Sequence, residues 1–237
     1  MSPGTALIVY HGCDVTTRDN LVSGRLKHLD HSRNQYDWLG PGAYFFEGDV
    51  ERALLFAQAS HRNPDKRYTA KPIATPAVVG AILQVQSWLD MTTQAGIKNF
   101  SSAYQVFAAG RHAEGKPVPT NRRASATDAD VIYRALDNAV FTWLHNARAS
   151  QDPPLPPFQA VRAAFYQGET VAPTSGFHAN THIQISLLDN DCVVAWFLPA
   201  GAELLTEHQF AEAKVRLDAF AARNNKPRVR IKNPATL

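Results

Sequence analysis

Short runs of β-branched and other apolar residues recur along the chain and predict strands. They occupy residues 7–10, 40–46, 77–88, 161–166, 181–187 and 192–198, the second of them opening with a glycine turn. In the run 181–187 apolar side chains alternate with polar ones, so His182, Gln184 and Ser186 share one face of the predicted strand. Two interpretations stay open for that face: the solvent side of a strand at the sheet edge, or one wall of a cleft.

Helical spacing of apolar residues appears in three segments. They are residues 50–60 with Asp49 as a cap, the stripe 131–144 with Ser125 as a cap, and a C-terminal segment over about 207–223. Residues 14–40 are polar and rich in turn formers, which predicts a long ordered loop. Strands separated by long loops and a few helices predict an α+β domain with a mixed or antiparallel sheet.

Composition narrows the class of protein without indicating a function. The chain has 237 residues, of which 45% are hydrophobic and 19% charged, so one domain over residues 1–237 can enclose a sizeable core. The formal net charge is +3, and a basic tail follows the last predicted helix over 224–237. This charge permits contact with nucleic acid but does not argue for it. We expect no membrane contact, because every apolar run is far shorter than a bilayer span.

The cysteines and the first residues bear on the compartment. Cys13 and Cys192 are the only cysteines and lie far apart, which argues against a disulfide framework and a structural zinc site. The first residues lack the basic region and apolar stretch of a secretory signal. These features together favour a cytoplasmic protein.

Three segments combine small, aromatic and polar residues in a pattern that points to chemistry. They are His11-Gly12 after the first apolar run, Gly40-Pro-Gly42-Ala-Tyr44-Phe45, and the run from Gln184 through Asp189 to Val193. In order and spacing they resemble the signature of the poly(ADP-ribose) polymerase-like branch of the ADP-ribosyltransferases, a His, a Tyr and a Glu on three separate strands. The resemblance implies an ADP-ribosyltransferase-like fold, in which helices flank a central split sheet of mixed or antiparallel strands.

The resemblance also implies roles for single residues in a site that uses NAD as its substrate and needs no metal. His11 is expected to hydrogen-bond a ribose hydroxyl, the Gly12 backbone to bind the nicotinamide carboxamide, and the Tyr44 ring to stack on the nicotinamide. Further candidate NAD contacts are Gly42 in the turn, Ser32 and Asn34 as donors to phosphate or ribose, and Tyr36 and Trp38 over the adenosine half. Turn capping is the alternative for Ser32 and Asn34, and packing of the loop on the core is the alternative for the two aromatics.

Two positions depart from the family pattern. Gln184 stands in place of the glutamate, and its amide oxygen can accept a bond from the ribose, but an amide cannot take a proton. This substitution argues against polymer formation, and Glu169 and His182 are the candidates to supply what Gln184 lacks. Arg52 stands where the polymerases have a serine that binds the carboxamide, so we expect this chain to hold the carboxamide differently.

The leading hypothesis is a mono-ADP-ribosyltransferase that cleaves the nicotinamide-ribose bond of NAD and transfers ADP-ribose to a protein or nucleic acid. The resemblance suggests an intracellular toxin or phage-defence effector, with an antitoxin as a partner. Hydrolysis of NAD by water and an inactive module that binds NAD or a partner are the alternatives.

Arginines outside the three motifs allow two further predictions. A basic segment over 111–123 makes Arg122 and Arg123 candidates for binding the acceptor, and solvated surface is the plainer interpretation. Arg162, in an otherwise apolar strand, is expected to pair with a carboxylate inside the fold.

Overall fold

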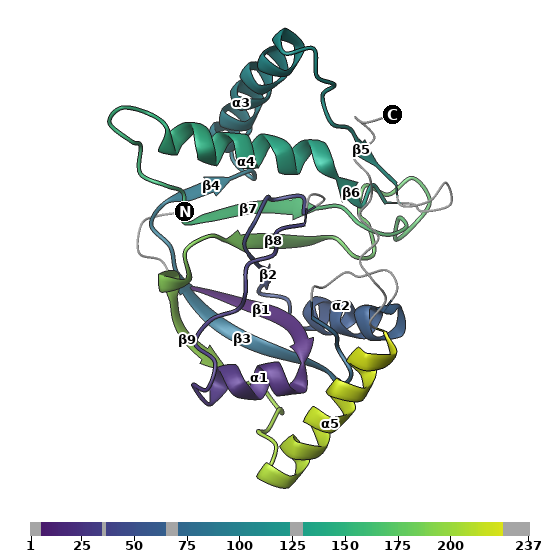
Figure 1. The fold of residues 1–237 in the computed structure, drawn as a ribbon. Helices are drawn as coiled ribbons and strands as arrows, with labels where there is room; N and C mark the ends of the chain where they lie inside the picture. The colour runs from purple at the N-terminus through teal and green to yellow at the C-terminus, as the bar shows by residue number, and fades with distance from the viewer. Residues whose placement is uncertain (1–5, 35–36, 65–70, 124–129, 225–237) are drawn as a thin grey trace.

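A computed structural model describes residues 6–34, 37–64, 71–123 and 130–224 of the chain. In this part of the chain, seven strands form one sheet in the order β4-β7-β8-β2-β1-β3-β9 (Figure 1). Their bounds, in that order, are Trp88–Asp90, Ala160–Phe165, His182–Leu187, Ala43–Glu47, Ala6–Asp14, Pro76–Gln84 and Val193–Phe197. β4 and β7 are parallel and all other neighbours are antiparallel, so the predicted α+β class with a mixed sheet is confirmed.

The sheet is narrowly connected in its middle. β1 pairs with β3 over all of its residues. With β2, however, β1 pairs at only two positions, Val9 with Glu47 and Tyr10 with Phe46. Beyond Tyr10 the two strands part, so one half of the sheet contains β4, β7, β8 and β2, and the other contains β1, β3 and β9.

Helices cover the sheet and are joined by loops and a short two-stranded hairpin. The helices are α1 (Val15–Val22), α2 (Val50–Arg62), α3 (Gln94–Ala113), α4 (Ala135–Ala149), α5 (Glu207–Arg223) and the 3-10 turn η2 (Asn190–Cys192), and the hairpin is β5 (Asn121–Arg122) with β6 (Tyr133–Arg134). α2 lies against β1 and β3, whereas α3 and α4 pack on each other beside β4 and β7 (Figure 1). No helix in the described ranges is long and apolar enough to cross a bilayer.

All three predicted helices are present, and two of them begin where predicted. Asp49 accepts a hydrogen bond from the backbone N of Arg52 at 2.8 Å and caps α2 as expected. α5 has the predicted bounds, and Thr206 with Gln209 forms a capping box at its start. The basic tail after it lies outside the described residues from 225 onward.

The polar segment predicted as a loop over residues 14–40 begins with α1 instead. Asp14 caps this helix by accepting a hydrogen bond from the backbone N of Thr16 at 2.9 Å. Arg18 and Asp19 are 8% and 1% exposed and form an ion pair with each other. The prediction was wrong here because α1 buries paired polar side chains, so the apolar periodicity that marks a helix is missing.

α3 has no counterpart among the predicted helices. Its fully buried residues are Gly96 and Ala103, and Phe100, at helical spacing between them, packs against Phe141 of α4 with ring centroids 4.9 Å apart. The helix therefore has a narrow apolar face, which the sequence prediction missed. The helix extends to Ala113, so Arg111 and His112, at the start of the basic segment over 111–123, belong to its last turn.

α4 begins later than the predicted stripe. Val131 and Ile132 precede the helix, which starts at Ala135. Asn121 of β5 provides a hydrogen-bond acceptor at the start of α4. Its side-chain oxygen accepts a hydrogen bond from the backbone N of Leu136 at 2.9 Å. The predicted cap, Ser125, lies outside the described residues.

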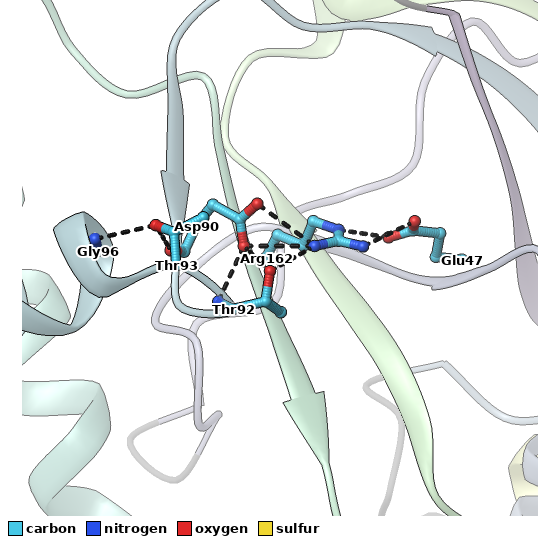
Figure 2. A network of polar contacts seen from close by, with 6 residues as sticks. All are labelled: Glu47, Asp90, Thr92, Thr93, Gly96 and Arg162. Atoms are coloured by element: carbon cyan, nitrogen blue, oxygen red, sulfur yellow. Dashed lines mark hydrogen bonds and ion pairs between the residues drawn. The ribbon is translucent and has the colours of Figure 1, made fainter. Parts of the chain in front are cut away.

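Arg162 forms the ion pairs expected of it. Its guanidinium donates from Nε to Glu47 of β2 at 2.6 Å and from Nη1 to Asp90 of β4 at 3.3 Å, as Figure 2 shows. Thr92 accepts a third bond from Arg162 and donates to Asp90, which closes the network. The charged side chains from β2, β7 and β4 therefore tie three strands of one half-sheet together.

Candidate functional site

His11 lies where β1 and β2 part. Its Nδ1 is 2.7 Å from the carbonyl oxygen of Tyr44, and its ring contacts the Phe45 ring edge-on at 5.8 Å between centroids. Because a carbonyl oxygen only accepts, Nδ1 carries the proton and Nε2 of the neutral ring is an acceptor. The backbone pairing of β1 with β2 ends at Tyr10, and the His11 side chain adds one more hydrogen bond between the two strands just beyond that point.

The electrostatic surroundings keep this ring neutral. Burial lowers the pKa of His11 below its ordinary value, and the charge of Lys71 lowers it further, whereas the bond to the Tyr44 carbonyl partly opposes both. At neutral pH the Nε2 lone pair is therefore available to a hydroxyl donor.

Gly12 has a packing reason to be glycine. A Cβ at this position would clash with the carbonyl oxygen of Ala53 and crowd the side chain of Ala57, both in α2. The close approach of α2 to β1 therefore requires glycine here, whatever else the Gly12 backbone binds. Its contact with the carboxamide stays a prediction.

Tyr44 fixes the glycine turn to the sheet. Its hydroxyl donates to the carbonyl oxygen of Gly40 at 2.7 Å and accepts from the backbone N of Leu39 at 3.1 Å. Gly42 has a φ of 146°, and a Cβ there would clash with the side chain of Ser186 on β8. The turn thus folds closely over β8, and the half-buried Tyr44 ring packs beside Leu39. Stacking of this ring on nicotinamide stays a prediction.

Ser32 and Asn34 belong to one turn network. The Ser32 hydroxyl donates to Asp37, and the Asn34 side-chain amide donates to the Ser32 hydroxyl at 3.0 Å. Asn138 of α4 donates to the carbonyl oxygen of Asp37 at 2.8 Å and anchors the turn. These contacts favour the turn-capping interpretation, and contact of Ser32 or Asn34 with NAD stays a prediction. Tyr36 lies outside the described residues.

Gln184 is not on an edge strand. β8 lies between β7 and β2, and Gln184 is paired with Ala163 on one side and Phe46 on the other. The interpretation as a solvent-facing edge position is therefore wrong. Gln184 lies two residues from Ser186, the partner of Tyr44, so Gln184 and Tyr44 share a face of the sheet.

A tryptophan holds the Gln184 amide. Trp38 Nε1 donates to Gln184 Oε1 at 2.5 Å. The Trp38 ring meets the Phe165 ring edge-on, with centroids 4.6 Å apart, and the Arg134 guanidinium carbon lies 5.3 Å from the Trp38 centroid and 4.6 Å from that of Phe165. Accepting a ribose hydroxyl through Oε1 would therefore use the second lone pair of that oxygen.

Arg52 and His182 form a second polar group on this face. Arg52 lies over the Phe46 ring at 5.0 Å and donates to Gln167, while its Nε is buried without a partner. His182 Nδ1 donates to the carbonyl oxygen of Asn180 at 2.7 Å, and its Nε2 is also buried without a partner. Burial lowers the pKa of His182 to about 4, and Arg52 adds to the shift, so His182 is neutral at neutral pH and brings no charge.

The remaining candidates lie at the surface. Glu169 is exposed in the loop between β7 and β8. Arg122 and Arg123 are exposed, and the Arg122 guanidinium lies 5.1 Å from the Tyr133 ring centroid across the β5–β6 hairpin. Arg134, on the same hairpin, lies against the Trp38 ring. The hairpin therefore connects the residues predicted to bind the acceptor, Arg122 and Arg123, with the Trp38 indole.

Sequence reasoning missed Trp38, Phe165 and Arg134 as partners of one another. From the sequence, Trp38 is expected only to stack over the adenosine half of NAD or to pack on the core, and the other two lie on elements distant in the chain. No spacing signal connects them, because their contacts follow from the register of β7 with β8 and from the hairpin before α4.

Two cavities in the described part of the chain lie away from these residues. One cavity is lined by Trp88, Asp90 and Gly96 beside the start of α3, and another lies between α3 and α4 around Ala103 and Leu144. Neither includes His11, Tyr44 or Gln184. A search of the described ranges finds no group of three or more His, Cys, Asp or Glu side chains placed to hold a metal ion.

Comparisons with known proteins find no relative: no family model, no curated protein and no solved structure matches the chain. The function of the site must be inferred from its own residues.

Proposed function

We propose that the chain is an NAD-dependent mono-ADP-ribosyltransferase whose reaction centre lies at the split between β1 and β2. The observation that carries the proposal is the order of three neighbouring strands, β1 with His11, β2 with Tyr44 and β8 with Gln184. The His11 ring bonds the backbone carbonyl of Tyr44 and contacts the Phe45 ring, whereas Gln184 lies on the face of the Tyr44 side chain. This arrangement supports the resemblance, which requires these three residue positions on three strands.

The proposed reaction needs positioning more than acid or base chemistry. The bond between ribose C1′ and the nicotinamide nitrogen breaks, its electron pair leaves with neutral nicotinamide, and C1′ becomes an oxocarbenium-like centre. A lone pair of the acceptor forms the new bond to C1′, and the acceptor proton passes to solvent. The protein contributes by holding the ribose and by stabilising the developing charge. His11 Nε2 would accept a ribose hydroxyl in this scheme.

Gln184 limits the reaction to a single transfer. It can hydrogen-bond the ribose, but it has no charge and takes no proton from an acceptor hydroxyl. Chain growth would require activation of a ribose hydroxyl on the previous unit, so the product is a single ADP-ribose.

Labelled NAD tests the proposal and separates it from hydrolysis. The protein is incubated with NAD labelled in the adenosine half, together with cellular protein, RNA and DNA as separate acceptors, and label is counted in each fraction. We expect label in one macromolecular fraction in proportion to the nicotinamide released. Label found only as free ADP-ribose would indicate an NAD glycohydrolase, and no release of nicotinamide would contradict both activities.

The acceptor class can be read from the β5–β6 hairpin. For a nucleic-acid acceptor, changing both Arg122 and Arg123 to serine should raise the acceptor KM and flatten its dependence on salt, because fewer phosphate charges are neutralised. The measurement is initial transfer rate against salt concentration. If the wild type and the double variant had equal transfer rates and equal dependence on salt, the acceptor would more readily be a protein than a nucleic acid.

Two substitutions of Tyr44 separate its structural and binding roles. Tyr44→Phe removes the hydroxyl bonds to Leu39 and Gly40 and should lower the free energy of unfolding by about 1–3 kcal/mol. It keeps the ring, so NAD affinity should be unchanged. Tyr44→Ala removes the ring, and loss of stacking should weaken NAD affinity and turnover, by about 0.5–1.5 kcal/mol in binding. Calorimetric titration with NAD gives the answer, and normal affinity in a folded Tyr44→Ala protein would exclude a nicotinamide pocket at this ring.

A further inference from the structure

The contact between Trp38 and Gln184 fixes which end of the Gln184 amide is occupied. An indole N–H is a donor only, so the atom of Gln184 that faces Trp38 Nε1 at 2.5 Å must be the amide oxygen. The NH₂ group, with its two donors, is the end that Trp38 leaves unused. The orientation of the Gln184 amide therefore follows from the fact that an indole N–H can only donate.

We propose that Trp38 is a positioning residue that turns the oxygen of Gln184 towards its indole and presents the Gln184 NH₂ group to the ribose of NAD. The inference rests on the proposed function, and it assigns residue 184 the role of a hydrogen-bond donor to a ribose oxygen. A donor in this place holds the ribose without withdrawing a proton from it or from an acceptor.

Contacts on several sides hold the indole in place. The ring packs edge-on against Phe165 and lies beside the Arg134 guanidinium. Arg134 is itself fixed, because its Nε donates to the carbonyl oxygen of Val131 at 3.0 Å and its Nη1 pairs with Asp137 at 3.4 Å. A side chain confined in this way loses little freedom when it binds Gln184, which suits a positioning role.

A double-mutant cycle distinguishes positioning from a merely structural role. Trp38→Phe keeps an aromatic ring beside Phe165 and Arg134 but removes the indole N–H. We expect kcat for nicotinamide release to fall about three- to tenfold with KM for NAD little changed. In a Gln184→Ala background the same Trp38→Phe change should have no further effect. An equal loss in both backgrounds would overturn the positioning role.

Trp196→Phe is the matched control. Its indole N–H donates to the carbonyl oxygen of Lys27 at 3.0 Å, so this variant also loses one indole bond, but one that does not involve Gln184. The phenylalanine keeps an aromatic ring beside Phe45, which the Trp196 ring contacts. We expect it to keep the wild-type kcat. A loss equal to that of Trp38→Phe would show that any broken indole bond slows the reaction, which overturns the inference.

A measurement without turnover separates the inference from the proposed function. The chain has four tryptophans, and the Trp38 indole N–H signal in a ¹H–¹⁵N spectrum is assigned by its disappearance in Trp38→Phe. In Gln184→Ala this signal should shift and its exchange with solvent should accelerate, while the Trp196 signal stays in place. An unmoved Trp38 signal overturns the inference even if NAD is cleaved. A shifted signal in a protein that never cleaves NAD overturns the proposed function, and the positioning role of Trp38 in that reaction with it.

Discussion

Replacing Arg162 with methionine is expected to lower the free energy of unfolding by about 3–5 kcal/mol. The side chains of Arg162, Glu47 and Asp90 are only 12%, 16% and 9% exposed. Methionine has a similar length but no charge, so the variant leaves two carboxylates in the half-sheet without their shared cation. Unfolding in urea, followed by circular dichroism, measures the loss.

An exposed arginine supplies the control for Arg162. Arg216 pairs with Glu212 at 3.9 Å, with side chains 55% and 54% exposed. Such surface pairs contribute little, so Arg216→Met should change the free energy of unfolding by less than about 1 kcal/mol. If Arg162→Met lowered the free energy of unfolding as little as Arg216→Met does, the ion pairs of Figure 2 would contribute no more than surface pairs. They would then not be what holds the three strands together.

Gln184→Ala is expected to slow ADP-ribosyl transfer by roughly tenfold to a hundredfold, or about 1–3 kcal/mol. The variant leaves a ribose hydrogen-bonding group unpaired and also leaves the Trp38 indole without an acceptor. Gln184→Glu loses the NH₂ donor but should retain nicotinamide release. One carboxylate oxygen accepts the same Trp38 bond, the other can accept from the ribose hydroxyl, and the charge favours an oxocarbenium-like centre. Single-turnover rates for the two variants make the comparison.

Full activity of a folded Gln184→Ala protein would contradict this role. Glu169 and His182 would then be the residues to test, by Glu169→Gln and His182→Asn. The two differ in their surroundings, since Glu169 is exposed and His182 is buried and neutral.

The strands and two helices were predictable because their burial is apolar. In β3, Ala77, Val78, Val79, Gly80 and Ala81 are all buried, so both faces of the strand are covered, as the continuous apolar run indicated. α1 and α3 were not predictable from such a pattern. α1 buries the paired Arg18 and Asp19 and so lacks an apolar stripe. The apolar face of α3 is narrow, with Gly96 and Ala103 fully buried and Phe100 partly buried.

The candidate site was predictable only in part. His11, Tyr44 and Gln184 were singled out through the resemblance, and their strands turn out to be neighbours in the sheet. The bond from His11 to the Tyr44 backbone depends on where β1 and β2 part, and no residue spacing encodes that point. The same holds for Trp38, whose partner lies far along the chain.

Release of nicotinamide from NAD by the wild-type protein and by His11→Asn tests the central claim most directly. The asparagine side chain can still donate to the Tyr44 carbonyl in place of Nδ1, but it lacks the acceptor at Nε2. We predict that both proteins fold with similar stability, that the wild type releases nicotinamide, and that His11→Asn does so at least about tenfold more slowly. No release by the wild type, or an equal rate in a folded His11→Asn protein, would contradict an NAD-cleaving centre at the split between β1 and β2.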